Sequence, residues 1–221
     1  MLEFMLARSD TAAKSTGPGP AKLVEGDTLN GFYGKVNSGD LIASADLFNL
    51  CKLSAGRVHP SADNLGWAKV SIDNTILYVA LTPMRYELGW VDLNAANLIS
   101  GNTTVNILGY KFKVRLLKGL NLQATTIPET DAHLSSLDTS EWNRIMYRLC
   151  GSSPLTTSRW LNYTNSDLIT DTGYGSRTIC AEMINNMTAF RGNTNITSVH
   201  GFRSTNKGTN FGWRPVLELI Q

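Results

Sequence analysis

The sequence predicts an α+β fold in which strands from both ends of the chain share one sheet and a few short helices lie between them. The closing stretch, residues 213–220, alternates between two sets of side chains: Pro215, Leu217 and Leu219 against Arg214, Val216 and Glu218. Pro215 has no backbone N–H, so it should lie at the start or edge of a strand. A terminal strand needs an earlier partner, and we expect it to pair with the strand near Phe32.

Composition describes an ordinary globular chain. Its 221 residues are 42% hydrophobic and 17% charged, with a formal net charge of +2. Lys and Arg are scattered, so nucleic acid is not an expected partner. No apolar run reaches the roughly 18 residues that a membrane span needs, so we expect no membrane insertion. The three cysteines, Cys51, Cys150 and Cys180, lack metal-ligand or disulfide spacing and are expected to be small buried residues.

Residues 1–25 differ from the rest and are expected to form an extended N-terminal arm. A short apolar start leads through polar residues to Gly17-Pro18-Gly19-Pro20, which suits neither a helix interior nor a strand. The arm would order against a neighbouring subunit; a disordered tail is the alternative interpretation. The candidate residues for anchoring it are Leu2, Phe4, Met5, Leu6, Pro18 and Pro20.

Residues 26–221 are expected to form a single domain, with an alternative boundary near residues 120–137. Residues 31–36 read as its first strand. Residues 44–56 read as a short helix that Ser44 caps and Gly56 ends. The expected inward stripe of this helix consists of Leu47, Leu50 and Cys51.

Two further elements follow. Residues 67–81 predict a hairpin that turns through Asp73 and Asn74, because both residue types tolerate positive φ. Residues 90–98 predict a second short helix, with Asp92 as a candidate cap.

Residues 103–117 carry the clearest β signal, with a turn at Leu108-Gly109. Its second strand alternates apolar and cationic side chains: Tyr110, Phe112, Val114 and Leu116 against Lys111, Lys113 and Arg115. We expect the cationic face to be solvated. Binding of phosphate or acidic glycans by this face is the alternative.

The best helix signal covers residues 139–149. Asp138 and Glu141 have the spacing of a capping box, and Arg144 and Arg148 lie opposite the apolar stripe. That stripe consists of Trp142, Ile145, Met146 and Leu149.

Residues 152–212 show little regular pattern and are dense in Asn, Ser, Thr and Gly, so we expect a long irregular segment, a kind that is often functional. Asn amides and aromatic faces suit sugars and adaptable recognition. The candidate surface for a host ligand comprises Trp160, Tyr163, Arg191, Asn193, Asn195, Asn206 and Asn210. Asp167 and Asp171, four residues apart, are a weaker candidate for calcium.

No catalytic motif is recognisable. His59, His133 and His200 share no motif, and none has a Ser or Cys at a nucleophile spacing. A phosphate loop, a nucleophile elbow and a zinc-protease motif are all missing from the sequence. We therefore expect a non-enzymatic protein without a cofactor or a metal.

The order of these elements resembles a group of tailed-bacteriophage virion proteins whose C-terminal part is C-type-lectin-like. The resemblance rests on Ser-Glu-Trp-Asn-Arg-Ile at residues 140–145, a long segment with Trp160, and Gly-Trp-Arg-Pro-Val-Leu-Glu at residues 212–218. Earlier matching stretches are residues 31–36, 67–81, 90–94 and 113–117. Formylglycine-generating enzymes and phage tropism determinants share this fold.

The resemblance implies a lectin-like body with its first and last strands paired. Formylglycine-generating enzymes need two closely placed cysteines near the C-terminus, and this chain lacks that pair, so their activity is not implied. Tropism determinants bind ligands just before the final strand, which corresponds to residues 185–210. The expected role is a virion structural protein, made in the host cytoplasm and carried on tail, baseplate or capsid.

Such a protein would contact other virion proteins and form a homo-oligomer, for which we expect a trimer. The alternative role is a module that binds a host receptor or glycan through residues 160–210.

Overall fold

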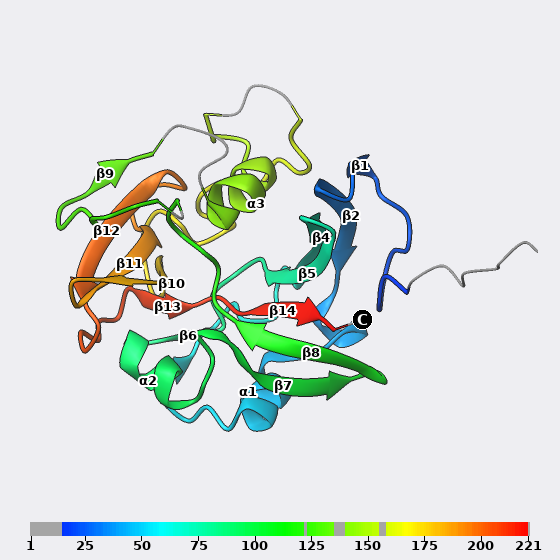
Figure 1. The fold of residues 1–221 in the computed structure, drawn as a ribbon, viewed down its shortest axis with the longest axis horizontal. Helices are drawn as coiled ribbons and strands as arrows, with labels where there is room; N and C mark the ends of the chain where they lie inside the picture. Colours follow the sequence, from blue (N-terminus) through cyan, green and yellow to red (C-terminus); the bar gives the residue numbers. More distant parts are fainter. Residues whose placement is uncertain (1–14, 122, 135–139, 155–157, 221) are drawn as a thin grey trace, which may run out of the picture.

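The computed structural model describes residues 15–121, 123–134, 140–154 and 158–220. These residues form two seven-stranded sheets and three short α-helices, which confirms the expected α+β character (Figure 1). The expected arm tip, with Leu2, Phe4, Met5 and Leu6, lies outside the described residues.

The first sheet has the order β1-β2-β4-β5-β14-β8-β7, and all of its neighbouring strands are antiparallel. Its hairpins confirm the strands expected at 67–81 and 103–117, and the turn residues Asp73 and Asn74 have φ of 49° and 63°. The strands are β1 (Glu25–Gly26), β2 (Asn30–Val36), β4 (Trp67–Ile72), β5 (Thr75–Ala80), β7 (Ser100–Ile107), β8 (Tyr110–Arg115) and β14 (Val216–Leu219).

Direct pairing of the first and last strands, which we expected, is wrong. Strand β14 lies between β5 and β8, with Leu217 opposite both Tyr78 and Val114. Both edges of β14 are therefore occupied, and β2 pairs with β4 instead, with Phe32 opposite Val70. The two ends of the domain share one sheet but are separated by the β4–β5 hairpin.

The second sheet has the order β3-β6-β13-β10-β11-β12-β9, and only its β10–β13 pair is parallel. Strands β10, β11 and β12 form an antiparallel meander, seen at the left of Figure 1. The strands are β3 (Arg57–Val58), β6 (Arg85–Tyr86), β9 (Ala132–His133), β10 (Arg177–Ile184), β11 (Met187–Gly192), β12 (Ser198–Arg203) and β13 (Phe211–Trp213).

The long irregular region expected at 152–212 is wrong from residue 177 onward, because four strands lie there, whereas the described residues between 152 and 176 contain no helix or strand. Its pattern is obscured by small polar side chains that are fully buried, such as Thr178, Thr188 and Ser198. Asn185 and Asn186, with φ of 51° and 62°, make the tight β10–β11 turn. Asp73 and Asn74 make the same kind of turn between β4 and β5.

The closing stretch is two strands and joins the two sheets. Strand β13 belongs to the second sheet and β14 to the first, with Arg214 and Pro215 between them. Pro215 therefore lies where no ladder N–H is needed, and its carbonyl accepts a hydrogen bond from Ala80 N at 3.1 Å. The expected alternation holds in β14, since Leu217 and Leu219 pack in one core cluster and Val216 in another.

Helices α1 (Ser44–Cys51) and α2 (Trp90–Ala95) lie on one side of the first sheet and α3 (Glu141–Leu149) on the other (Figure 1). A short 3-10 helix covers Ser38–Asp40. The four stripe residues of α3 are fully buried, as expected. All three cysteines are buried, as expected, and none forms a disulfide.

The expected helix ends need correction. The N-cap of α1 is Ala43, and Ser44 instead donates its hydroxyl to Asp63 at 2.8 Å. The helix ends at Lys52, which is left-handed with φ of 53°, before Gly56 is reached. In its stripe, Leu50 is exposed and Phe48 takes the inward place.

Capping at the other two helices also differs in detail. In α3, Ser140 caps Asn143 N, and Asp138, the expected cap, lies outside the described residues. In α2 the cap position is Gly89, whose N–H donates to the Asp92 carboxylate at 2.8 Å.

Candidate functional site

Residues 15–20, hereafter the strap, hold the described part of the arm against the first sheet. Pro18 and Pro20, for which we expected contact with a neighbouring subunit, bind their own body through backbone carbonyls. The Lys69 ammonium donates to Pro20 O at 2.6 Å, Pro18 O at 2.9 Å and Gly17 O at 3.2 Å. The Tyr78 hydroxyl donates to Pro18 O at 2.6 Å.

The strap fully buries Lys69. The rings of Tyr33 and Tyr78 lie 5.2 and 5.6 Å from the ammonium and add cation–π attraction. Burial lowers the pKa of Lys69 to about 8. A strand side chain on the core face thus recognises the backbone of the arm.

Two of the seven candidate ligand residues are buried, so their expected place on an exposed surface is wrong. Trp160 stacks on Phe32 with centroids 5.5 Å apart and the Arg148 guanidinium 5.6 Å from its ring. Arg191 is fully buried and donates to Gly119 O at 2.7 Å, to the Tyr147 hydroxyl at 3.0 Å and to Ser198 O at 3.1 Å.

The candidate asparagines are spread over the meander. Asn210 donates its amide to Asn193 Oδ1 at 3.3 Å, so these two lie together. Asn195 supports the β11–β12 turn by accepting from Thr197 N at 2.9 Å. Asn206 is exposed beyond the far end of β12. The structure therefore does not bring the seven residues into one site.

Tyr163 lines a pocket of about 500 Å³ at the C-terminal end of α3, hereafter the α3 pocket. The segment that follows α3 forms most of it, and the β11–β12 turn closes one side. Its polar lining includes Ser152, Asn162, Asn165, Asp171 and Thr194. Sequence reasoning missed most of these residues, and the only signal for them was the density of Asn, Ser and Thr.

A larger pocket of about 810 Å³ lies at the opposite end of the meander, hereafter the hairpin pocket. The Asn185–Asn186 turn and residues 203–205 meet there. Ile127 and Glu129 line it from the segment that precedes α3. The stretch 185–210 thus contributes to pockets at both ends of the meander.

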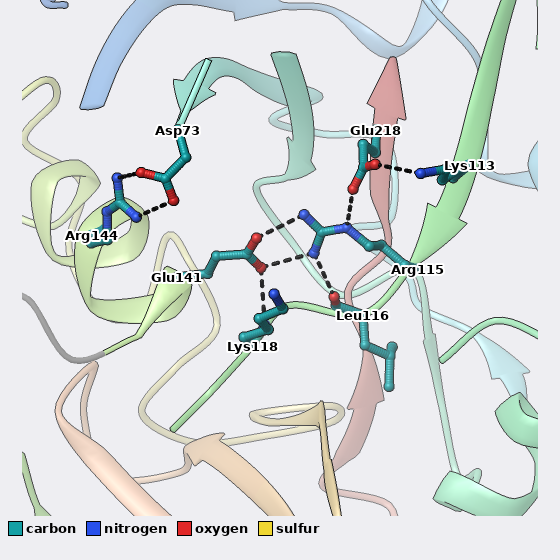
Figure 2. Close-up of polar contacts among 8 residues, drawn as sticks. All are labelled: Asp73, Lys113, Arg115, Leu116, Lys118, Glu141, Arg144 and Glu218. Carbon is teal, nitrogen blue, oxygen red and sulfur yellow. Dashed lines mark hydrogen bonds and ion pairs between the residues drawn. The ribbon is translucent and has the colours of Figure 1, made fainter. Parts of the chain in front are cut away.

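The cationic face of β8 is largely neutralised within the protein (Figure 2). Arg115 forms a bidentate ion pair with Glu141, at 2.7 and 2.8 Å, and donates from Nε to Glu218 at 2.8 Å. Lys113 also pairs with Glu218, at 3.0 Å. Lys111 is exposed and Lys113 half-exposed, so the expectation of a solvated face is wrong only for Arg115. With Lys113 and Arg115 paired to carboxylates, the face is poorly suited to bind anions.

These contacts shift the pKa values of the paired groups. Burial alone would raise the pKa of Glu218, but hydrogen bonds and charge from Lys113 and Arg115 outweigh it and hold the pKa below its ordinary value. Burial likewise opposes the charge of Arg115, yet Glu141 and Glu218 keep its pKa above the usual range.

Two of the three histidines, His59 and His200, are buried. His59 Nδ1 accepts from Ser61 N, so Nε2 carries the proton that is donated to Tyr174 O at 3.0 Å. His200 Nε2 lies 3.4 Å from Asp131 Oδ1, without hydrogen-bond geometry. Burial lowers the pKa of His200 and outweighs the opposing effect of Asp131.

The carboxylates considered for calcium are engaged in local bonds. Asp167 accepts from Thr164 N at 2.8 Å, and Asp171 accepts from the Ser166 hydroxyl and from Thr172 N. Within the described residues, no three His, Cys, Asp or Glu side chains lie together as metal ligands would. No helix of the described chain is long and apolar enough to cross a membrane.

Comparison with known proteins adds no relative: no protein-family model, curated protein or solved structure matches this chain.

Proposed function

We propose that this protein is a non-enzymatic structural protein of a tailed-bacteriophage particle, displayed on its tail, baseplate or capsid. The body would be C-type-lectin-like, as the sequence resemblance implies. Two features of the fold support this proposal: the first and last strands share one sheet, and a long excursion separates α3 from the closing strands.

The observation that carries the proposal is the docked strap. Lys69 and Tyr78 bind four strap carbonyls, which fixes the strap at one defined point of the body. The apolar residues Leu2, Phe4, Met5 and Leu6 precede the strap in the sequence. An apolar segment tethered in this way suits attachment to other virion proteins and to copies of the same chain in a homo-oligomer, for which we propose a trimer.

The test is incorporation into particles of the phage that encodes the chain. We compare the wild type with a variant that lacks residues 1–14 and with one in which Leu2, Phe4, Met5 and Leu6 are replaced by Ser. Both variants keep the strap. We expect the wild type in purified particles and at least a tenfold loss for each variant, about 1.4 kcal/mol of anchoring.

Quantitative mass spectrometry of the particles gives the readout. Absence of the wild-type chain from particles would overturn the virion role. Normal incorporation of both variants would leave that role standing and overturn anchoring through the arm.

A second candidate function is recognition of a host receptor or glycan. The α3 pocket favours it, because amide and hydroxyl side chains surround the half-buried Tyr163 at the surface. Particles carrying Tyr163→Ala should adsorb to cells more slowly than particles carrying Asn206→Ala, which lies away from this pocket. Equal adsorption by both particles would contradict recognition through Tyr163.

A further inference from the structure

We propose that the α3 pocket binds a neutral saccharide through the Tyr163 ring and the side chains of Asn162 and Asp171. The inference rests on the recognition function proposed above and names its ligand class. Its failure would leave the virion role untouched, because that role is measured by incorporation into particles.

The chemistry of the lining matches sugar hydroxyls, which both donate and accept hydrogen bonds. Asn162 offers a donor and an acceptor, and Asp171 offers acceptors. Tyr163 supplies an aromatic surface for the C–H face of a sugar ring. Asp171 is the only charged side chain that lines the pocket in the described structure, and no cation lines it, so the lining disfavours an anionic ligand.

The pocket walls are held by hydrogen bonds. Asn165 donates to the Ser152 hydroxyl at 2.9 Å and accepts from Ile196 N at 2.8 Å and Thr170 Oγ1 at 3.1 Å. One amide therefore ties the segment after α3 to the β11–β12 turn. Such a preformed wall lowers the entropy lost when a ligand binds.

The backbone of Tyr163 is fixed on the end of α3. Tyr163 N donates to Leu149 O at 3.0 Å, and Gly151 N donates to Tyr163 O at 2.8 Å. These bonds form a parallel bridge between Cys150 and Tyr163. The ring is thus carried by a rigid element, although its side chain is only half-buried.

Gly151 has no side chain, and this leaves room for the side-chain amide of Asn162. A Cβ at position 151 would lie 2.0 Å from Asn162 Oδ1 and 2.9 Å from its Cγ, so any larger residue must displace this amide. The φ of Gly151 is not in the left-handed region, so Ala is conformationally acceptable there. Gly151→Ala therefore perturbs the pocket with little effect on the backbone.

The hairpin pocket is larger but less suited to a specific ligand. Glu129 and Arg203 give it opposite charges. Among the described residues that line it, none is aromatic, so it offers no flat surface for a sugar ring. Residues of this pocket therefore serve as matched controls.

The experiment is saturation-transfer NMR followed by calorimetric titration with the full chain. The probes are the methyl glycosides of glucose, galactose, mannose and N-acetylglucosamine, with sialic acid and a sulfated disaccharide for comparison. We expect binding of at least one neutral glycoside. Gly151→Ala and Tyr163→Ala should each weaken it about tenfold or more, and Thr205→Ala should leave it unchanged.

Urea unfolding of each variant separates loss of binding from loss of folding. If Tyr163→Ala does not fold, Gly151→Ala and Asp171→Asn carry the test. The proposal is overturned if the folded wild type binds no neutral glycoside, if only the acidic probes bind, or if the folded pocket variants bind as tightly as Thr205→Ala.

Discussion

Arg115 and Glu141 form a bidentate ion pair between β8 and α3, and the two side chains are only 9% and 10% exposed. Glu141 also accepts from Lys118 N, and Arg115 also binds Glu218 on β14 (Figure 2). Through these two carboxylates, Arg115 links helix α3 to the last strand, β14. Because both charged groups are mostly excluded from water, each needs its partner to offset the cost of burial.

We predict that Arg115→Met lowers the free energy of unfolding by about 3–5 kcal/mol, because it leaves two carboxylates without their shared cation. The measurement is urea unfolding at neutral pH. The matched control is Arg57→Met. Arg57 pairs with Glu87 at the same 2.8 Å but is 69% exposed.

An exposed pair contributes little, so Arg57→Met should change the free energy of unfolding by less than about 1 kcal/mol. The double variant Arg115→Met/Glu141→Leu should recover part of the loss, since it removes the unpaired charge with its partner. Equal losses for Arg115→Met and Arg57→Met would show that burial of the pair has no energetic consequence.

The lowered pKa of Lys69 predicts that the free energy of unfolding depends on pH in the alkaline range. Its pKa is about 8 in the folded protein and 10.5 in its ordinary state, so between these values the unfolded chain binds more protons. The free energy of unfolding should therefore rise with pH across this window. Below about pH 8 the lysine is charged in both states, and the burial penalty is fully present.

The test compares wild type with Lys69→Met in urea from pH 7 to pH 9.5, below the range where exposed tyrosines titrate. Burial also raises the pKa of Tyr78, so this neighbour stays neutral in the folded protein. Wild type should gain stability relative to Lys69→Met as pH rises. A constant difference would mean that Lys69 titrates normally beneath the strap.

Local signals in the sequence were sufficient for the hairpins and for α3. Asp73 and Asn74 mark a turn by residue type alone, and the stripe of α3 follows helical spacing with large apolar side chains. Both depend only on neighbouring residues. The same turn signal is present at Asn185-Asn186, but the strands around it lack apolar alternation.

What could not be predicted depends on contacts between distant segments. Arg191 can be buried because Gly119 and Tyr147, each more than forty residues away in the sequence, accept hydrogen bonds from its guanidinium. Strand β14 could not be assigned to β5 and β8 from its own pattern, which fixes the face of each side chain but not the neighbouring strand. The α3 pocket likewise needs the β11–β12 turn to reach the end of α3.

Gly19 should be required for the strap to dock on the first sheet. Gly19 has φ of 76°, and a Cβ there would lie 2.7 Å from Val36 Cγ2. We predict that Gly19→Ala lowers the free energy of unfolding by about 1–2 kcal/mol, from left-handed strain alone. It should also speed proteolytic cleavage near residue 20.

Gly39 provides the control, since it has ordinary φ and no atom within 4 Å of its Cβ position. Gly39→Ala should be neutral or slightly stabilising in the same assays. If the strap of Gly19→Ala is as resistant to protease as that of Gly39→Ala, neither the left-handed backbone of Gly19 nor its close approach to Val36 is needed to hold the strap.

Arg191 should be essential for stability and not for ligand contact. Its guanidinium lies 5.6 Å from the Trp142 ring and satisfies two carbonyls and the Tyr147 hydroxyl in a fully buried position. Arg191→Leu leaves these acceptors unpaired, and each such group costs about 1–3 kcal/mol, so we predict a loss of about 3 kcal/mol or more in urea unfolding. Arg203→Leu, an exposed change on the adjacent strand, should stay within about 0.5 kcal/mol of wild type. Comparable stability of the two variants would mean that these buried contacts of Arg191 contribute little to the free energy of unfolding.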